Sequence, residues 1–190
     1  KIVDLTPFAD IWNQSSKKMI LVGVNDPHAI NDATIDFLAN DVSVTVWTET
    51  TSNLHHPSFI TNIDTIITPF ATEDFESFQP EILITFGGMV VSKRIKAFLR
   101  KYKPKHHWHI DSHRAYDTFG ALSQHFEVES QVFFNQFIPL TKCVESDYSI
   151  RLAEIQSIRK SKHEAYLASI PFSDFTVFES IIPSLPNNSQ

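Results

Sequence analysis

The sequence is short of cysteine, glycine and long apolar runs, and each shortage excludes a class of protein. Its 190 residues include one cysteine and four glycines. The single cysteine, Cys143, cannot form an intramolecular disulfide, which favours a reducing compartment. No apolar run reaches the roughly 20 residues that a membrane-spanning helix needs, and the opening KIVDLTPFAD is not a signal peptide. We therefore expect a soluble, cytoplasmic protein with no membrane span.

Positive charge is also scarce. The chain has 16 Lys and Arg against 22 Asp and Glu, which gives a net charge of −6. Nucleic acids and anionic membranes favour basic surfaces, so neither is expected as the main partner. The first apolar run is followed by GVNDPH, which lacks the G-x-G-x-x-G motif of the usual dinucleotide-binding mode. No G-x-S-x-G elbow occurs, and Cys143 lies in no nucleophile motif, so nucleophilic catalysis has little support.

The sequence does contain short apolar runs separated by segments of helical period. This alternation is typical of a parallel sheet covered by helices on both faces. The predicted strands are Met19–Val24, Ser43–Thr48, Ile63–Ile67, Glu81–Phe86, His107–Asp111 and His125–Val128. The predicted helices are Pro27–Ala39, Ser92–Tyr102, Ser130–Phe137, Asp147–Leu167 and Ser173–Ile182. The predicted fold is α/β, a three-layer Rossmann-like domain with a mostly parallel six-stranded sheet in the order 3-2-1-4-5-6.

The length suits one domain with an appended segment. We assign residues 1–140 to a central Rossmann-like domain and residues 141–190 to a helical linker that begins another, truncated domain. Pro171 and Pro183 interrupt this last part, as is typical of a linker. The chain begins with Lys and ends in the polar PNNSQ, so we expect an excised fragment.

The stretch FGGMVVSKR, residues 86–94, is the leading candidate for a binding site. In the predicted order the winding reverses between the first and fourth strands, where ligands bind in such folds. The two glycines would let the backbone approach a ligand, and Ser92 would cap the next helix. Lys93 and Arg94 then occupy its first turn, where the helix dipole disfavours cations. A bound carboxylate or phosphate would explain the pair, whereas two solvated charges are the alternative.

The surrounding sequence is basic, because no acidic residue lies between Ile82 and Ile110. The cations in this stretch are Lys93, Arg94, Lys96, Arg100, Lys101, Lys103 and Lys105. Further along, alternation places His107, His109 and Asp111 on one face of a strand, an arrangement that could bind zinc. Buried, hydrogen-bonded histidines are the favoured interpretation, and no metal site is predicted.

Together these segments make the chain closely resemble the central domain of the 2-succinyl-5-enolpyruvyl-6-hydroxy-3-cyclohexene-1-carboxylate synthase (MenD) family. The resemblance lies in KKMILVGVNDP, TETTSNLHHP, FQPEILITFGGMVVSKRIKAFLRKYKPKHHWHID and AYDTF. It implies a thiamine-diphosphate- and Mg²⁺-dependent transferase of menaquinone biosynthesis, with flanking pyrimidine- and diphosphate-binding domains. Such an enzyme decarboxylates 2-oxoglutarate and adds the resulting succinyl-semialdehyde carbanion to isochorismate. The full-length protein is expected to be a homo-oligomer.

The resemblance also implies that Lys93 and Arg94 contribute to the substrate pocket. Ser92 is a further candidate, as is Asn53 in the loop after the second strand, although Asn53 is equally suited to forming a turn. The family's activating glutamate and metal-binding G-D-G…N pattern belong to the flanking domains. No catalytic, cofactor-binding or metal-binding residue is therefore expected here, and the fragment alone is predicted to be inactive.

Two alternatives stay open. The domain could be a regulatory module that binds an anion or a nucleotide, or it could be purely structural, with the Lys-Arg pair at an oligomer interface.

Overall fold

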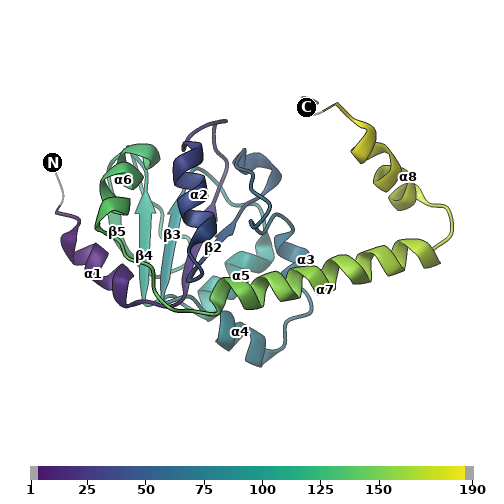
Figure 1. Cartoon of the computed structure of the whole chain (residues 1–190), viewed down its shortest axis with the longest axis horizontal. Coiled ribbons are helices and arrows are strands. Elements are labelled where there is room, and N and C mark those ends of the chain that lie inside the picture. The colour runs from purple at the N-terminus through teal and green to yellow at the C-terminus, as the bar shows by residue number, and fades with distance from the viewer. Residues whose placement is uncertain (1–3, 187–190) are drawn as a thin grey trace.

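A single parallel sheet forms the centre of the computed structural model, which describes residues 4–186 (Figure 1). Its strands are β1 (Lys18–Val22), β2 (Val44–Trp47), β3 (Ile82–Phe86), β4 (His106–Ile110) and β5 (Leu122–Phe126). They lie in the order β2-β1-β3-β4-β5, and every adjacent pair is parallel. The first three strands are buried at every residue, which accounts for their mostly apolar sequences. The predicted α/β class is confirmed.

The predicted third strand is wrong, because Ile63–Ile67 forms the helix α3. Its first, fourth and fifth residues are buried, which is the spacing of one helical face. The sheet therefore has five strands instead of six, and the predicted order loses its outermost member. A single parallel bridge between Trp47 and Ile60 lies beside β2, where that strand was expected.

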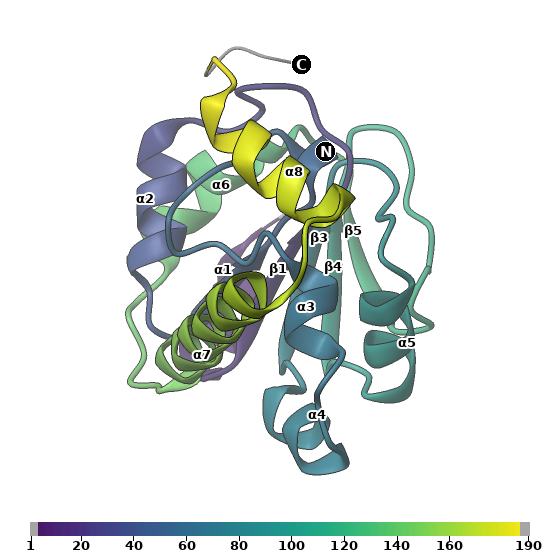
Figure 2. The ribbon, with the colours of Figure 1, turned by 90° about the vertical axis from the view of Figure 1, so that its right-hand side faces the viewer.

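Helices cover both faces of the sheet, as Figure 2 shows. The α-helices are α1 (Thr6–Gln14), α2 (Asp32–Asn40), α3 (Ile63–Ile67), α4 (Thr72–Phe78), α5 (Lys93–Lys101), α6 (Ser130–Phe137), α7 (Tyr148–Ser169) and α8 (Asp174–Ile181). Short 3-10 turns are η1 (Thr50–Ser52), η2 (Ile138–Leu140) and η3 (Ile182–Ser184). One core cluster joins the sheet to α1, α2 and α6, and the other joins it to α3, α5 and the start of α7. The three-layer architecture follows.

Most predicted helices are present, but α1 and α4 were not predicted. The helix expected from Pro27 begins later, at Asp32, because the Asn31 side chain accepts a hydrogen bond from the Thr34 N–H at 2.9 Å and caps it there. In α5, Ser92 is the N-cap, as predicted.

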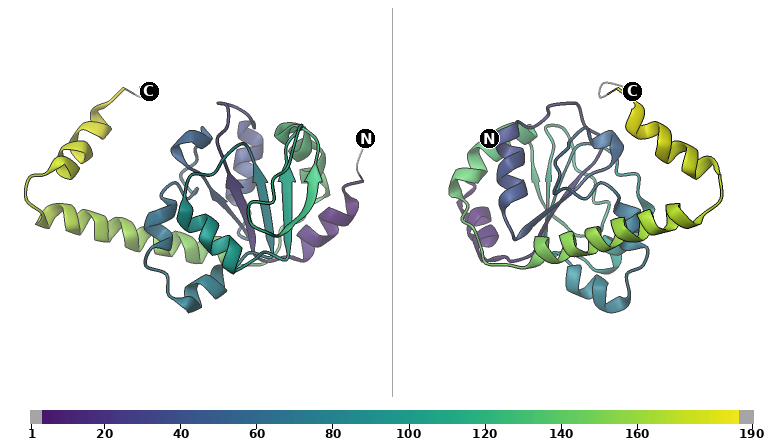
Figure 3. Two further views of the ribbon diagram at one scale, coloured as in Figure 1. Left: turned by 180° about the vertical axis from the view of Figure 1, so that it is seen from behind. Right: turned by 45° about the vertical axis from the view of Figure 1, so that its right-hand side comes forward.

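The helix α7 extends beyond the sheet (Figures 1 and 3). Only Tyr148 and Leu152 of its 22 residues are buried. The Tyr148 hydroxyl donates to the Phe78 carbonyl at 3.0 Å, and the Arg151 guanidinium lies 5.0 Å from the centre of the Phe78 ring. The next helix, α8, turns back from the far end and leaves Phe178 61% exposed. The domain division at residue 140 coincides with the end of η2 and stays a prediction.

Within residues 4–186, no helix combines the length and the apolar character needed to cross a membrane.

Candidate functional site

The winding of the sheet reverses between β1 and β3, and the loops that follow these two strands are pressed together. The Gly88 N–H donates to the Val24 carbonyl at 2.6 Å, and the Val24 N–H donates to the Met89 carbonyl at 3.2 Å. A Cβ on Gly23 would lie 2.1 Å from the Gly88 carbonyl oxygen. The glycines therefore permit two loops of the chain to approach one another, and this contact closes the usual ligand crevice.

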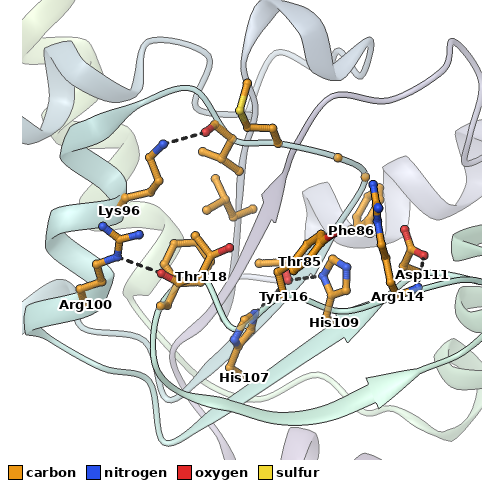
Figure 4. Close-up of a pocket in the computed structure, with 16 residues that line it drawn as sticks. Thr85, Phe86, Lys96, Arg100, His107, His109, Asp111, Arg114, Tyr116 and Thr118 are labelled. Carbon is orange, nitrogen blue, oxygen red and sulfur yellow. Dashed lines mark hydrogen bonds between the residues drawn. The ribbon is translucent and has the colours of Figure 1, made fainter.

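A cavity of about 450 Å³ lies next to this closed point, along β3 and β4 and beneath α5 (Figure 4). Leu21 and Phe119 contribute apolar surface to it. Its polar lining includes Thr85, Lys96, Arg100, His107, His109 and Arg114. The cavity is thus apolar in part and bordered by cations.

Two histidines share one hydroxyl on the sheet face of this cavity. The Thr85 Oγ1 lies 2.9 Å from His107 Nε2 and 2.8 Å from His109 Nδ1. Because a hydroxyl has one proton, it can donate to only one of the two rings, so at least one ring nitrogen donates to Thr85 Oγ1. The favoured interpretation of hydrogen-bonded histidines is confirmed. No group of His, Cys, Asp or Glu suited to a metal ion occurs in the part of the chain that the structure describes.

Burial keeps both imidazoles neutral near pH 7. His107 is 1% exposed, and burial, reinforced by the neighbouring His109, lowers the pKa of His107 to about 4. Burial also lowers the pKa of His109. The Nδ1 atom of His107 has no hydrogen-bond partner among residues 4–186, so a proton there would gain no compensating contact.

Cations at the cavity border hold the loops around it. Lys96 Nζ donates to the Val90 carbonyl at 3.1 Å, and Arg100 Nε donates to the Thr118 carbonyl at 2.8 Å (Figure 4). The Arg114 guanidinium lies 5.1 Å from the centre of the Tyr116 ring. These contacts leave a net positive border, which suits a small organic anion.

The loop that carries Arg114 is fixed by Asp111. The Asp111 carboxylate accepts the N–H groups of His113 at 2.7 Å and Arg114 at 2.9 Å. Burial acts to raise the pKa of Asp111, but these two hydrogen bonds, together with the nearby His109 and His113, outweigh it and hold the pKa below its ordinary value. The carboxylate is therefore a stable anchor for the loop near neutral pH.

Lys96, Arg100 and Arg114 were not among the binding residues predicted from the sequence. Lys96 and Arg100 are four residues apart on α5 and so share a face, whereas Ile95, Phe98 and Leu99 form its buried face. That spacing was the available signal. Arg114 has no such signal, because it lies in the irregular segment after β4.

The predicted substrate-binding residues Ser92, Lys93 and Arg94 lie at the start of α5 and do not line this cavity. Ser92 borders a separate shallow hollow, and Arg94 borders a groove against α4. Lys93 and Arg94 are exposed. Their binding of substrate stays a prediction.

The start of α5 already holds a carboxylate from within the chain. Glu49 Oε1 accepts the Ser92 N–H at 2.6 Å, and Glu49 Oε2 accepts the Val91 N–H at 2.7 Å. Ser92 Oγ accepts the Ile95 N–H at 3.2 Å and donates to Asp64 at 2.5 Å. Sequence reasoning missed Glu49 because it lies 42 residues from Val91 and belongs to no local motif. Its charge offsets the helix dipole beside the two cations.

Asn53 forms a turn. It follows η1 with a positive φ of 49° and is exposed, and its Nδ2 donates to the Asn25 carbonyl at 2.8 Å. This contact ties the loop after β2 to the loop after β1. A contact between Asn53 and substrate stays a prediction.

A family profile described as the middle domain of thiamine pyrophosphate matches residues 6–190. The 2-succinyl-5-enolpyruvyl-6-hydroxy-3-cyclohexene-1-carboxylate synthase of Flavobacterium psychrophilum is 61% identical over 98% of this chain and 34% of its own length. The synthases of the same name from Flavobacterium johnsoniae and Christiangramia forsetii are 59% and 48% identical, over 95% and 97% of this chain and 33% of their lengths. The chain thus spans about a third of these curated relatives, and the resemblance predicted from the sequence is confirmed.

Proposed function

We propose that this chain is the middle domain of a 2-succinyl-5-enolpyruvyl-6-hydroxy-3-cyclohexene-1-carboxylate synthase. The chain belongs to the family of thiamine pyrophosphate middle domains. The complete protein would be a thiamine-diphosphate-dependent transferase of menaquinone biosynthesis that acts in the cytoplasm. It decarboxylates 2-oxoglutarate and adds the succinyl-semialdehyde unit to isochorismate. The high identity to three synthases across nearly the whole chain supports this proposal.

Residues 4–186 do not fit thiamine diphosphate and Mg²⁺. No group of acidic, His or Cys side chains in this range is suited to a metal ion, and the N–H groups of Val91 and Ser92 at the start of α5 are taken by Glu49. We therefore assign cofactor and metal to the flanking pyrimidine- and diphosphate-binding domains of a homo-oligomer. The exposed apolar side chains of α8, such as Phe175 and Phe178, provide a surface for such a domain.

The role of this domain in the reaction is to position substrate. Both substrates are carboxylic acids, and Lys93 and Arg94 can bind a carboxylate by charge-assisted hydrogen bonds. The observation that carries this role is their availability: both side chains are exposed, and neither forms an ion pair within residues 4–186. Glu49 stabilises the helix start below them, so their charge is free to act on a ligand.

Steady-state kinetics of the complete synthase tests this role. Lys93→Ala should raise the KM for isochorismate several-fold with little change in kcat, because it removes an interaction made in the bound state. The matched control is Lys101→Ala, at the opposite end of α5. An unchanged KM in Lys93→Ala rejects the substrate role.

A second candidate function is a regulatory module that binds an anion or nucleotide. The cavity of about 450 Å³ favours it, because Arg100 and Arg114 border a partly apolar space large enough for a small organic anion. Calorimetric titration of the chain with carboxylates and with ADP distinguishes the two functions. Binding that survives Lys93→Ala supports the second function, whereas no binding to the chain rejects it.

A further inference from the structure

The hydrogen bonds of Glu49 connect the loop after β2 to the loop after β3 at the carboxyl edge of the sheet. Its two carboxylate oxygens accept the adjacent N–H groups of Val91 and Ser92 at 2.7 and 2.6 Å. A carboxylate that accepts two backbone N–H groups makes charge-assisted bonds, which are among the stronger hydrogen bonds in proteins. These two amides are the last ones before Lys93 and Arg94. The position of Glu49 therefore fixes the backbone from which both cations extend.

Glu49 is itself held at its backbone. Its N–H donates to Ser52 Oγ at 2.9 Å, and that hydroxyl donates to the Val22 carbonyl at 2.8 Å. Ser52 is completely buried, and Val22 is the last residue of β1. This chain of hydrogen bonds links the start of α5 to β1, an inner strand of the sheet. Asp64, on α3, holds the same point from another side through Ser92 Oγ.

From this geometry we propose that Glu49 is a positioning residue for Lys93 and Arg94. It holds residues 91–92 in the conformation that directs both cations toward substrate, and it supplies the negative charge that lets two cations occupy a helix start before substrate binds. The inference rests on the proposed substrate role of the pair and extends it to a residue 44 positions before Lys93 in the sequence. Glu49 itself does not contact substrate.

The variant Glu49→Gln tests the proposal in the complete synthase. A glutamine oxygen accepts one N–H, but its NH₂ group then faces the other amide as a second donor. Hydrogen exchange measured by mass spectrometry over residues 87–95 should become roughly tenfold faster or more, because hydrogen bonds to charged groups are strong. Exchange in β3 should not change. Glu127→Gln, which makes the same charge change at an exposed position after β5, is the matched control and should leave both regions unaltered.

Kinetics then separates positioning from general destabilisation. Glu49→Gln should raise the KM for isochorismate several-fold with little change in kcat. In the double variant Lys93→Ala, Arg94→Ala, adding Glu49→Gln should not raise the KM further, because Glu49 acts through that pair. Unchanged exchange at residues 87–95, or a KM effect that persists in the double-alanine background, overturns the proposal. If Lys93→Ala raises KM but Glu49→Gln does not, only the role of Glu49 is rejected. If Lys93→Ala has no effect, the substrate role itself is rejected.

Discussion

Acid should destabilise this domain through His107, and the expected size of the effect follows from its burial. In an unfolded chain a histidine takes up its proton near pH 6.5, whereas burial lowers the pKa of His107 to about 4 in the fold. Between these two values the unfolded state binds more protons, so the contribution to stability is complete above pH 6.5 and is lost as the pH falls toward 4. Each pH unit within this window costs about 1.4 kcal/mol. At pH 5 the loss is therefore about 2 kcal/mol.

The comparison of wild type with His107→Gln isolates this contribution. Glutamine places a polar atom near the position of Nε2, where it can keep the hydrogen bond to Thr85, but it does not titrate. Urea unfolding followed by tryptophan fluorescence at pH 7 and pH 5 gives the two free energies of unfolding. The wild type should lose about 2 kcal/mol more than His107→Gln between these pH values.

Two further variants separate His107 from the other titrating groups. His55 is exposed, so His55→Gln should keep the full pH dependence of the wild type. Thr85→Val removes the hydroxyl that His107 and His109 share and should lower stability at pH 7 without removing the titration. Equal losses in wild type and His107→Gln would refute the reasoning.

The remaining predictions concern the closed crevice and the cavity. Gly23→Ala should lower the free energy of unfolding by about 3 kcal/mol, because the new Cβ would overlap the Gly88 carbonyl. Gly88→Ala should lower it far less, since its Cβ would meet only Val24 atoms at 3.5 Å. Urea unfolding of the two variants checks this, and equal costs would contradict the close packing. Arg114→Gln should lower the affinity of the cavity for a titrated organic anion roughly tenfold, whereas Glu127→Gln should leave that affinity unchanged. Calorimetry measures both affinities. Equal affinities in the two variants would mean that the anion binds outside the cavity.

Local patterns were sufficient for much of the fold. The β1 and β3 runs are mostly apolar and buried at every residue, so their sequence indicated strands covered on both faces, whereas β2 (VTVW) is buried on both faces although its sequence includes Thr45. The serine cap of α5 was also predictable, because Ser92 immediately precedes the helical segment. These features depend on residues that are neighbours in the sequence.

The helix α3 could not be predicted in the same way. Four of the five residues in IDTII are β-branched, which favours a strand, while the burial of Ile63, Ile66 and Ile67 fits a helix. In so short a run the choice depends on tertiary packing against α5 and α7. This packing favours the helix α3 over a strand.

The site was less predictable than the fold for a related reason. The cations and the cap of α5 were visible in the sequence, but the carboxylate that accepts the N–H groups of Val91 and Ser92 comes from Glu49, in the loop after β2. The cavity likewise depends on how Arg100 and Thr118 meet across a loop. Contacts between residues far apart in the sequence leave no mark in a local pattern, so only coordinates reveal them.

The helix α7 is attached to the domain near its first residues only. Tyr148 at its buried end donates to the Phe78 carbonyl, while its 22 residues extend about 33 Å at 1.5 Å per residue. A tilt of α7 by about 10° about its buried end would displace its far end by about 6 Å, given that length. Small rearrangements of α4 beneath the buried end of α7 would therefore be amplified into large displacements of α8. The packing of Tyr148, Arg151 and Leu152 thus sets how accurately α7 positions α8.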